Sequence, residues 1–118
     1  MANAAPPNRT FQAAVERPLS VVFRSPEGRL EGHDYRVEVV TESQALDTFE
    51  VVMDFRDLEA ALDALLGPLD HGCLTALASP EALAGHILNQ LTPRVPSPAR
   101  LAEVTLTDGR GRRLTLRP

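Results

Sequence analysis

The stretch of chain from Asp34 to Val40 constrains the fold more than any other part of the sequence, because apolar and polar residues alternate along it up to Val39. Residues two apart on a strand share a face, so this pattern predicts a strand with one buried side. His33 has the parity of the apolar set and is expected at the edge of the buried face. That set is Tyr35, Val37 and Val39.

A second strand is predicted just upstream, at Leu19–Arg24, where Val21, Val22 and Phe23 suit a pleated surface. The Ser-Pro-Glu-Gly sequence at 25–28 is turn chemistry, so the two strands should form a hairpin. A weaker strand candidate covers 10–15. We therefore expect residues 1–18 to be an N-terminal tail, in part a strand, and residues 19–118 to be the folded domain.

Two helices should follow the hairpin. The first is capped by Asp54 and ends before Gly67-Pro68. The second begins at Ser79-Pro80-Glu81, which is a cap, a proline at the first position and an acid, and Pro93 ends it. The first helix has an apolar stripe that is expected to face inward, made of Phe55, Leu58, Ala61, Leu62, Leu65 and Leu66.

The C-terminal segment predicts another hairpin, with alternation over 102–107, a turn at Asp108–Gly111 and a returning strand through Leu114 and Leu116. The element order is therefore ββααββ. The expected class is α+β, a four-stranded antiparallel sheet with two helices on one face.

Composition excludes several classes of function. A chain of 118 residues is one domain, and its net charge of -4, with arginines spread along the sequence, provides no basic stripe for nucleic acid. No apolar run approaches the ~20 residues of a membrane span. The lone Cys73 and the lack of a signal-like start predict a cytoplasmic protein.

Several short motifs, in this order and spacing, resemble those of the 6-pyruvoyl- and 6-carboxy-tetrahydropterin synthases. They are Gly32-His33-Asp34-Tyr35, Val52-Met53-Asp54-Phe55-Arg56-Asp57-Leu58, Leu69-Asp70-His71 and Ser79-Pro80-Glu81-Ala82-Leu83-Ala84. The resemblance covers most of residues 19–108 and implies the tunnelling fold, which has the same ββααββ order.

The sequence departs from that family at the residues that bind zinc. Family enzymes hold the ion with three histidines, of which only the last remains here, as His33, while Glu31 occupies the middle position. Two alignments of the first strand are open. In the first alignment, Val15 takes the first ligand position and Glu27 takes the position of the catalytic cysteine. In the second alignment, Glu27 takes the first ligand position. We prefer the second because 19–24 is the stronger strand.

Glu27, Glu31 and His33 are thus the candidate metal ligands. The resemblance implies zinc, and a set with two carboxylates would favour a harder ion such as Mn or Mg more than three imidazoles do. The more ordinary alternative is that both glutamates are solvated and that His33 is a strand-edge residue bonded to backbone.

The resemblance assigns proton transfer to Asp70 and His71, with Glu27 as a further catalytic candidate at the cysteine position. An aspartate can fix a histidine tautomer and raise its pKa towards neutrality, as a general acid or base requires. The alternative, to which we give equal weight, is that Asp70 and His71 only complete a turn.

Two further carboxylates are candidates for ligand binding. Asp108 matches the late family glutamate that grips the guanidine-like edge of a pterin, although an aspartate in a hairpin turn is the more ordinary explanation. Glu81 lies in the segment that matches the family's Thr-x-Glu-Asn-Leu-Ala.

These residues support three hypotheses of function. The one we prefer is a diverged tetrahydropterin-synthase-like protein that binds a pterin or purine-like ligand without the zinc-dependent chemistry. The alternatives are an active lyase on dihydroneopterin triphosphate with an altered metal site, and a structural or interaction domain. The resemblance also predicts a homo-oligomer, a trimer or a hexamer.

Overall fold

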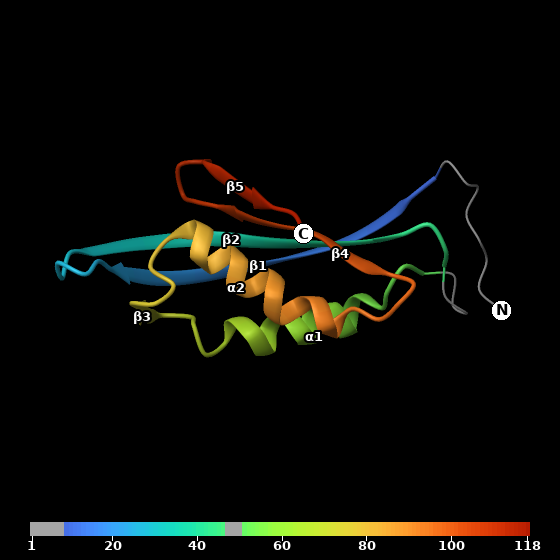
Figure 1. The fold of residues 1–118 in the computed structure, drawn as a ribbon, viewed down its shortest axis with the longest axis horizontal. Helices are drawn as coiled ribbons and strands as arrows, with labels where there is room; N and C mark the ends of the chain where they lie inside the picture. Colours follow the sequence, from blue (N-terminus) through green and yellow to red (C-terminus); the bar gives the residue numbers. More distant parts are fainter. Residues whose placement is uncertain (1–8, 47–50) are drawn as a thin grey trace.

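A computed structural model describes residues 9–46 and 51–118, and these form one sheet with two helices (Figure 1). The strands lie in the order β3-β1-β2-β4-β5. Met1–Asn8, expected to be a tail, lie outside the described residues, as do residues 47–50. The elements are β1 Phe11–Arg24, β2 Leu30–Ser43, α1 Phe55–Leu66, β3 Gly72–Leu74, α2 Pro80–Leu91, a short 3-10 helix Thr92–Arg94, β4 Arg100–Thr107 and β5 Arg113–Leu116.

The predicted N-terminal hairpin is confirmed and is longer than expected. The candidates at 10–15 and 19–24 form one continuous strand, β1, which pairs antiparallel with the whole of β2. Its turn is closed by the hydrogen bond from the Gly28 amide to the Ser25 carbonyl, 2.9 Å, and Gly28 has a φ of 85°. Glycine adopts such a positive φ at no steric cost, which explains its place in this turn.

The expected four-stranded antiparallel sheet is wrong in one respect, because a fifth strand makes the sheet mixed. β3 pairs parallel with β1, Val21 beside Gly72 and Phe23 beside Leu74. The His71 amide donates to the Ser20 carbonyl at 2.7 Å and so begins this pairing. A strand of three residues is too short to show the alternation from which strands are predicted.

Both helices begin where their caps predicted. The Asp54 carboxylate accepts the Arg56 amide at 2.9 Å, and the Ser79 hydroxyl accepts the Ala82 amide at 3.0 Å. These bonds satisfy amides that have no partner within the helix. α1 buries most of its apolar stripe, but Phe55, expected to face inward, is 54% exposed.

The two helices cover one face of the sheet and share a single core with it. Tyr35, Val37 and Val39 are buried in this core, as the alternation of β2 predicted. The described part of the molecule is elongated, 55 × 25 × 20 Å, because the β1–β2 hairpin extends beyond the helices. Within residues 9–46 and 51–118, no helix is long and apolar enough to cross a membrane.

Candidate functional site

A cavity of about 410 Å³ lies where the buried face of β2 meets the first turn of α2 and the β4–β5 hairpin. It contains four of the residues singled out from the sequence, Glu31, His33, Glu81 and Asp108. The volume is within the usual range for sites that bind small molecules. Residues separated by 77 positions in the chain are therefore brought to one place by the sheet and the helix packed on it.

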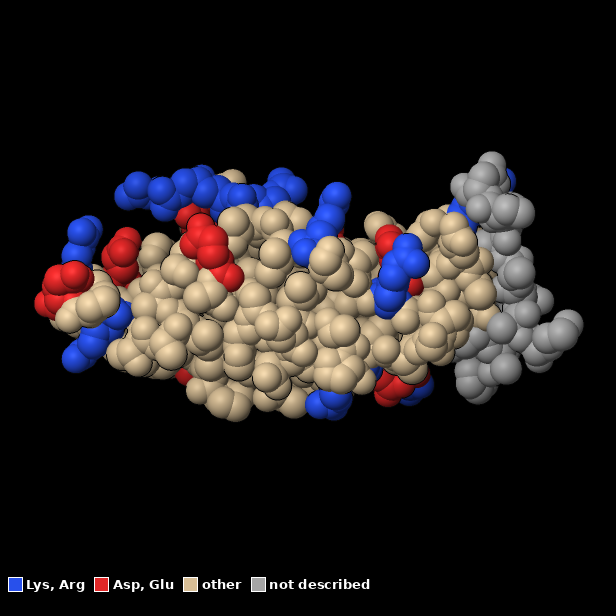
Figure 2. Space-filling model, in the orientation of Figure 1, with Lys and Arg blue, Asp and Glu red and all other residues tan. Residues whose placement is uncertain are grey.

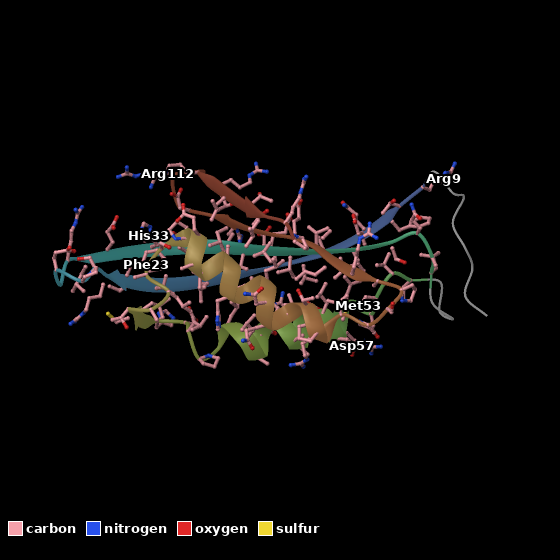
Figure 3. All side chains as sticks on the ribbon, in the orientation of Figure 1. Arg9, Phe23, His33, Met53, Asp57 and Arg112 are labelled. Carbon is pink, nitrogen blue, oxygen red and sulfur yellow. The ribbon has the colours of Figure 1, made fainter. Side chains whose placement is uncertain are left out.

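His33 lies between two aromatic rings on the wall of this cavity. Its ring centroid is 5.1 Å from that of Phe23 and 5.3 Å from that of Tyr35, and it stacks on Tyr35 with an interplanar angle of 18°. The side chain is 19% exposed and its Nε2 is 3.8 Å from a carboxylate oxygen of Glu31. Figure 3 shows His33 and Phe23 at the same end of the molecule as Arg112. The wall is thus aromatic, with polar atoms at its edge.

The three carboxylates of the cavity differ in how much of their hydrogen-bonding capacity is already used. Asp108 accepts bonds from the backbone amides of Arg110 and Arg112 and from the Arg112 side chain. The side chain of Glu81, in the first turn of α2, makes no hydrogen bond or ion pair within the described ranges. Among the residues that the structure describes, the Glu31 side chain has a polar contact only with His33. Glu81 and Glu31 are therefore the carboxylates with lone pairs available for a ligand.

The negative charge of the cavity acts on Tyr35. Burial raises the pKa of the Tyr35 phenol, and the carboxylates of Asp108, Glu31 and Glu81 raise that pKa further. A phenol that stays protonated can donate a hydrogen bond. For Asp108, burial raises the pKa, but hydrogen bonds from the backbone and side chain of Arg112 and from the Arg110 amide outweigh this effect, and the pKa is lowered. Asp108 is thus held as an anion.

Asp70 and His71 do not line this cavity. His71 lines a separate hollow together with His33 and Asp34, and Asp70 bonds to Ser20, which also lines that hollow. Asp70 accepts the Ser20 amide at 3.0 Å, and its other oxygen is 3.5 Å from Nε2 of His71. His71 has a φ of 60° and its side chain is 81% exposed. The structure therefore brings Asp70 and His71 into contact and also gives them the expected role at the end of a turn.

Glu27 lies in the β1–β2 turn, in a smaller hollow that adjoins the cavity and shares Phe23, Glu31 and Ala78 with it. The residues that the structure describes contain no group of three His, Cys, Asp or Glu side chains placed to hold a metal ion. Glu27, Glu31 and His33 therefore do not converge as one set of ligands.

Comparison with known proteins now identifies the family. A model of the family described as 6-pyruvoyl tetrahydropterin synthase matches residues 8–118. The chain belongs to this family. Solved structures support the fold. The Caenorhabditis elegans 6-pyruvoyl tetrahydropterin synthase superposes with a TM-score of 0.80 at 18% identity over 98% of both chains.

Two further solved structures are similar to more than nine-tenths of the chain, and one curated protein is similar to about four-fifths of it. The Plasmodium vivax 6-pyruvoyl tetrahydropterin synthase has a TM-score of 0.73 at 18% identity over 94% of this chain and 99% of its own. The uncharacterized protein WS1659 of Wolinella succinogenes has a TM-score of 0.77 at 16% identity, over 93% of this chain and 99% of its own. The DNA mismatch repair protein MutL of Limosilactobacillus reuteri is 31% identical over 93 residues, 79% of this chain, which spans only 14% of that protein's length.

The register of the β1–β2 hairpin shows how this family member departs from a site made of three imidazoles. On β1, Val21 pairs with His33 and Phe23 pairs with Glu31, so apolar residues of β1 stand opposite both residues. Val15 pairs with Val39 instead, six residues and about 20 Å along the strand from His33. The residues present do not fit a zinc centre of three histidines.

Sequence reasoning did not assign Phe23, Tyr35, Arg112 or Arg113 to the site, although all of them line the cavity. Phe23 was assigned only to a strand and Tyr35 only to the buried face of the next strand, although His33 shares the parity of Tyr35 and this signal could have placed these two rings together. Arg112 and Arg113 follow directly on a predicted turn, and their proximity to α2 depends on the packing of the C-terminal hairpin.

Proposed function

We propose that this member of the 6-pyruvoyl tetrahydropterin synthase family binds a pterin or purine-like ring in the cavity and does not use the zinc-dependent chemistry. The observation that carries the proposal is the contrast between two groups of residues. The aromatic wall and the acceptor carboxylates are present in the cavity, whereas of the three histidine positions implied by the resemblance only His33 carries an imidazole, and Glu31 occupies the middle position.

The binding mode follows from the groups with free capacity. A pterin and a guanine both present an amide and an amino group side by side, and a carboxylate accepts such a pair of N–H bonds in bidentate fashion. Glu81 is the side chain we assign to this role, and Glu31 lines the same cavity. Phe23 and Tyr35 supply the apolar surface for the ring.

Thermal-shift measurements with pterin and guanosine test this proposal. A ligand that binds only the folded state raises the melting temperature as its concentration rises. We expect stabilisation of the wild type, loss of about tenfold in affinity in Glu81→Gln, and no loss in the matched control Glu38→Gln, on the polar face of β2. Failure of both rings to stabilise the protein at millimolar concentration would reject it.

A lyase acting on a reduced pterin is a second candidate, which one specific observation favours. A solved structure of the Plasmodium vivax enzyme is of a variant in which a catalytic glutamate is replaced by cysteine. A glutamate thus serves as a catalytic residue in that protein. Here Glu27 would take this role, with Asp70 and His71 as the proton relay; its hollow adjoins the cavity.

Turnover of dihydroneopterin triphosphate separates the two candidates. If the protein is a lyase, the wild type converts this substrate and Glu27→Gln does not. Circular dichroism checks that both proteins are folded. The binding proposal that we prefer requires that neither protein converts this substrate. Glu38→Gln again serves as the matched control.

We also propose that the chain forms a homo-oligomer. β1 pairs with β3 only at Val21–Phe23, so most of its outer edge carries no strand within the described residues. An exposed edge of this length is a template for pairing with another chain. Phe11 and Leu30, at the two ends of the hairpin, are 39% and 57% exposed.

A further inference from the structure

Arginines of the β4–β5 hairpin line the cavity together with its free carboxylates. Arg112 and Arg113 line it from the β4–β5 hairpin, and Arg110 lies in the same turn. Figure 2 shows a row of basic side chains over this hairpin, with acidic ones next to it. The overall charge of the chain is negative, so this local excess of positive charge is not a consequence of composition.

Asp108 fixes the position of Arg112. Its Oδ2 accepts the Arg112 Nε at 2.6 Å, while its Oδ1 accepts the Arg110 and Arg112 amides at 2.9 and 3.0 Å. One carboxylate therefore orders both the turn and the guanidinium. The family resemblance assigned the Asp108 carboxylate to a ligand, but here that carboxylate is already paired with Arg112. The Arg112 guanidinium takes the place of the guanidine-like edge of the ligand.

The donors that remain on these arginines are unused. The terminal nitrogens of Arg112 make no hydrogen bond within residues 9–46 and 51–118, and neither does the side chain of Arg113. A guanidinium held by its Nε still offers its outer N–H groups to a carboxylate or phosphate. The cavity is thus acidic at Glu31 and Glu81 and basic at the hairpin.

We propose that the β4–β5 hairpin is an anion-binding subsite, and that the ligand is a ring of the pterin or purine type that carries a carboxylate or phosphate. This inference rests on the proposed function. Asp108 acts as a positioning residue in it, and Arg112 and Arg113 contact the anionic group. The arrangement explains why a carboxylate expected to bind the ring is instead paired with arginine.

Matched ligands, titrated by calorimetry, test the inference. Pterin is compared with pterin-6-carboxylate, and guanosine with guanosine 5′-monophosphate, so that the two pairs distinguish a carboxylate from a phosphate. We expect at least one anionic ligand to bind about tenfold more tightly than its neutral partner, as for a charge-assisted hydrogen-bonded pair. Arg113→Gln, which removes no contact of the turn, should abolish this advantage, and Arg112→Gln should also do so.

The control variant is Arg94→Gln, in the short 3-10 helix and outside the cavity lining, which should keep the full advantage of the anionic ligand. If the neutral rings bind and neither anionic partner binds more tightly, the subsite is rejected while the proposed function stands. The subsite is rejected equally if Arg113→Gln retains the advantage. If no ring binds, neutral or anionic, both proposals fail.

Discussion

Asp108 shows how one side chain can lose an expected role to its neighbours. The sequence placed it in a turn and also at the position of a ligand-binding acid, and the structure gives three hydrogen bonds that belong to the turn. The remaining acceptors of the cavity, Glu31 and Glu81, are those without such partners. We therefore expect Glu31 and Glu81 to contact the proposed ligand, because their lone pairs are available, and not because of their position in a motif.

The lowered pKa of Asp108 makes a prediction about stability and pH. A carboxyl whose pKa is lower in the folded than in the unfolded state adds stability above its unfolded pKa, and loses this contribution as pH falls through the folded value. We expect Asp108→Asn to be less stable than wild type at pH 7. The difference should shrink below about pH 4, where the unfolded carboxyl is protonated.

Urea denaturation at pH 7 and at pH 3 measures this difference, with Glu38→Gln, a carboxylate outside any ion pair of the described residues, as the control. An equal effect of Asp108→Asn at both pH values would show that the hydrogen bonds of the turn do not depend on the charge of the carboxylate.

At the scale of elements, the helices were predictable and one strand was not. Asp54 and Ser79 cap their helices through side-chain bonds that depend only on local sequence, and this is why both starts were correct. β3 forms because the chain after α1 returns to pair with β1. This long-range contact cannot be predicted from the sequence of three residues. Phe55 is exposed because it is the first residue of α1, outside the turns that cover the core.

In the candidate site, too, local features were predictable from the sequence and long-range contacts were not. Glu31 and His33 could be paired from the alternation of β2 alone. Their meeting with Glu81 and Asp108 was suggested only through the family resemblance, because it depends on how α2 and the C-terminal hairpin pack. Nothing in the sequence around Arg112 and Arg113 indicated that they line the site, because basic residues next to a turn are ordinarily solvated.

The cap of α2 carries a prediction at this scale, because the helix start positions Glu81. Ser79→Ala removes the acceptor of the Ala82 amide and should lower the free energy of unfolding by about 1 kcal/mol. Ser79→Asp, which retains a capping oxygen, should stay close to wild type. Urea denaturation with an unchanged slope measures the loss; equal instability of both variants would mean that the hydroxyl acts through the cavity and not as a cap.

At the scale of the whole molecule, the elongated hairpin extends well beyond the two helices. A core of this shape leaves strand edges and the apolar Phe11 and Leu30 in contact with water. Pairing with further copies of the chain would cover them, because closed or extended sheets remove such edges.

Light scattering coupled to size-exclusion chromatography checks this expectation. We expect a mass of at least three chains at micromolar concentration, in line with the trimer or hexamer that the family resemblance implied. Phe11→Glu should shift the distribution towards smaller species, and Arg94→Gln should not. A monomer for the wild type would contradict the proposed assembly.

The central claim is that the fold of the 6-pyruvoyl tetrahydropterin synthase family is retained with ring binding but without dependence on zinc. Calorimetric titration of pterin-6-carboxylate into chelator-treated protein, with and without one equivalent of added zinc, tests it most directly. The account predicts the same affinity and stoichiometry in both titrations. Binding that appears only after zinc is added would contradict it.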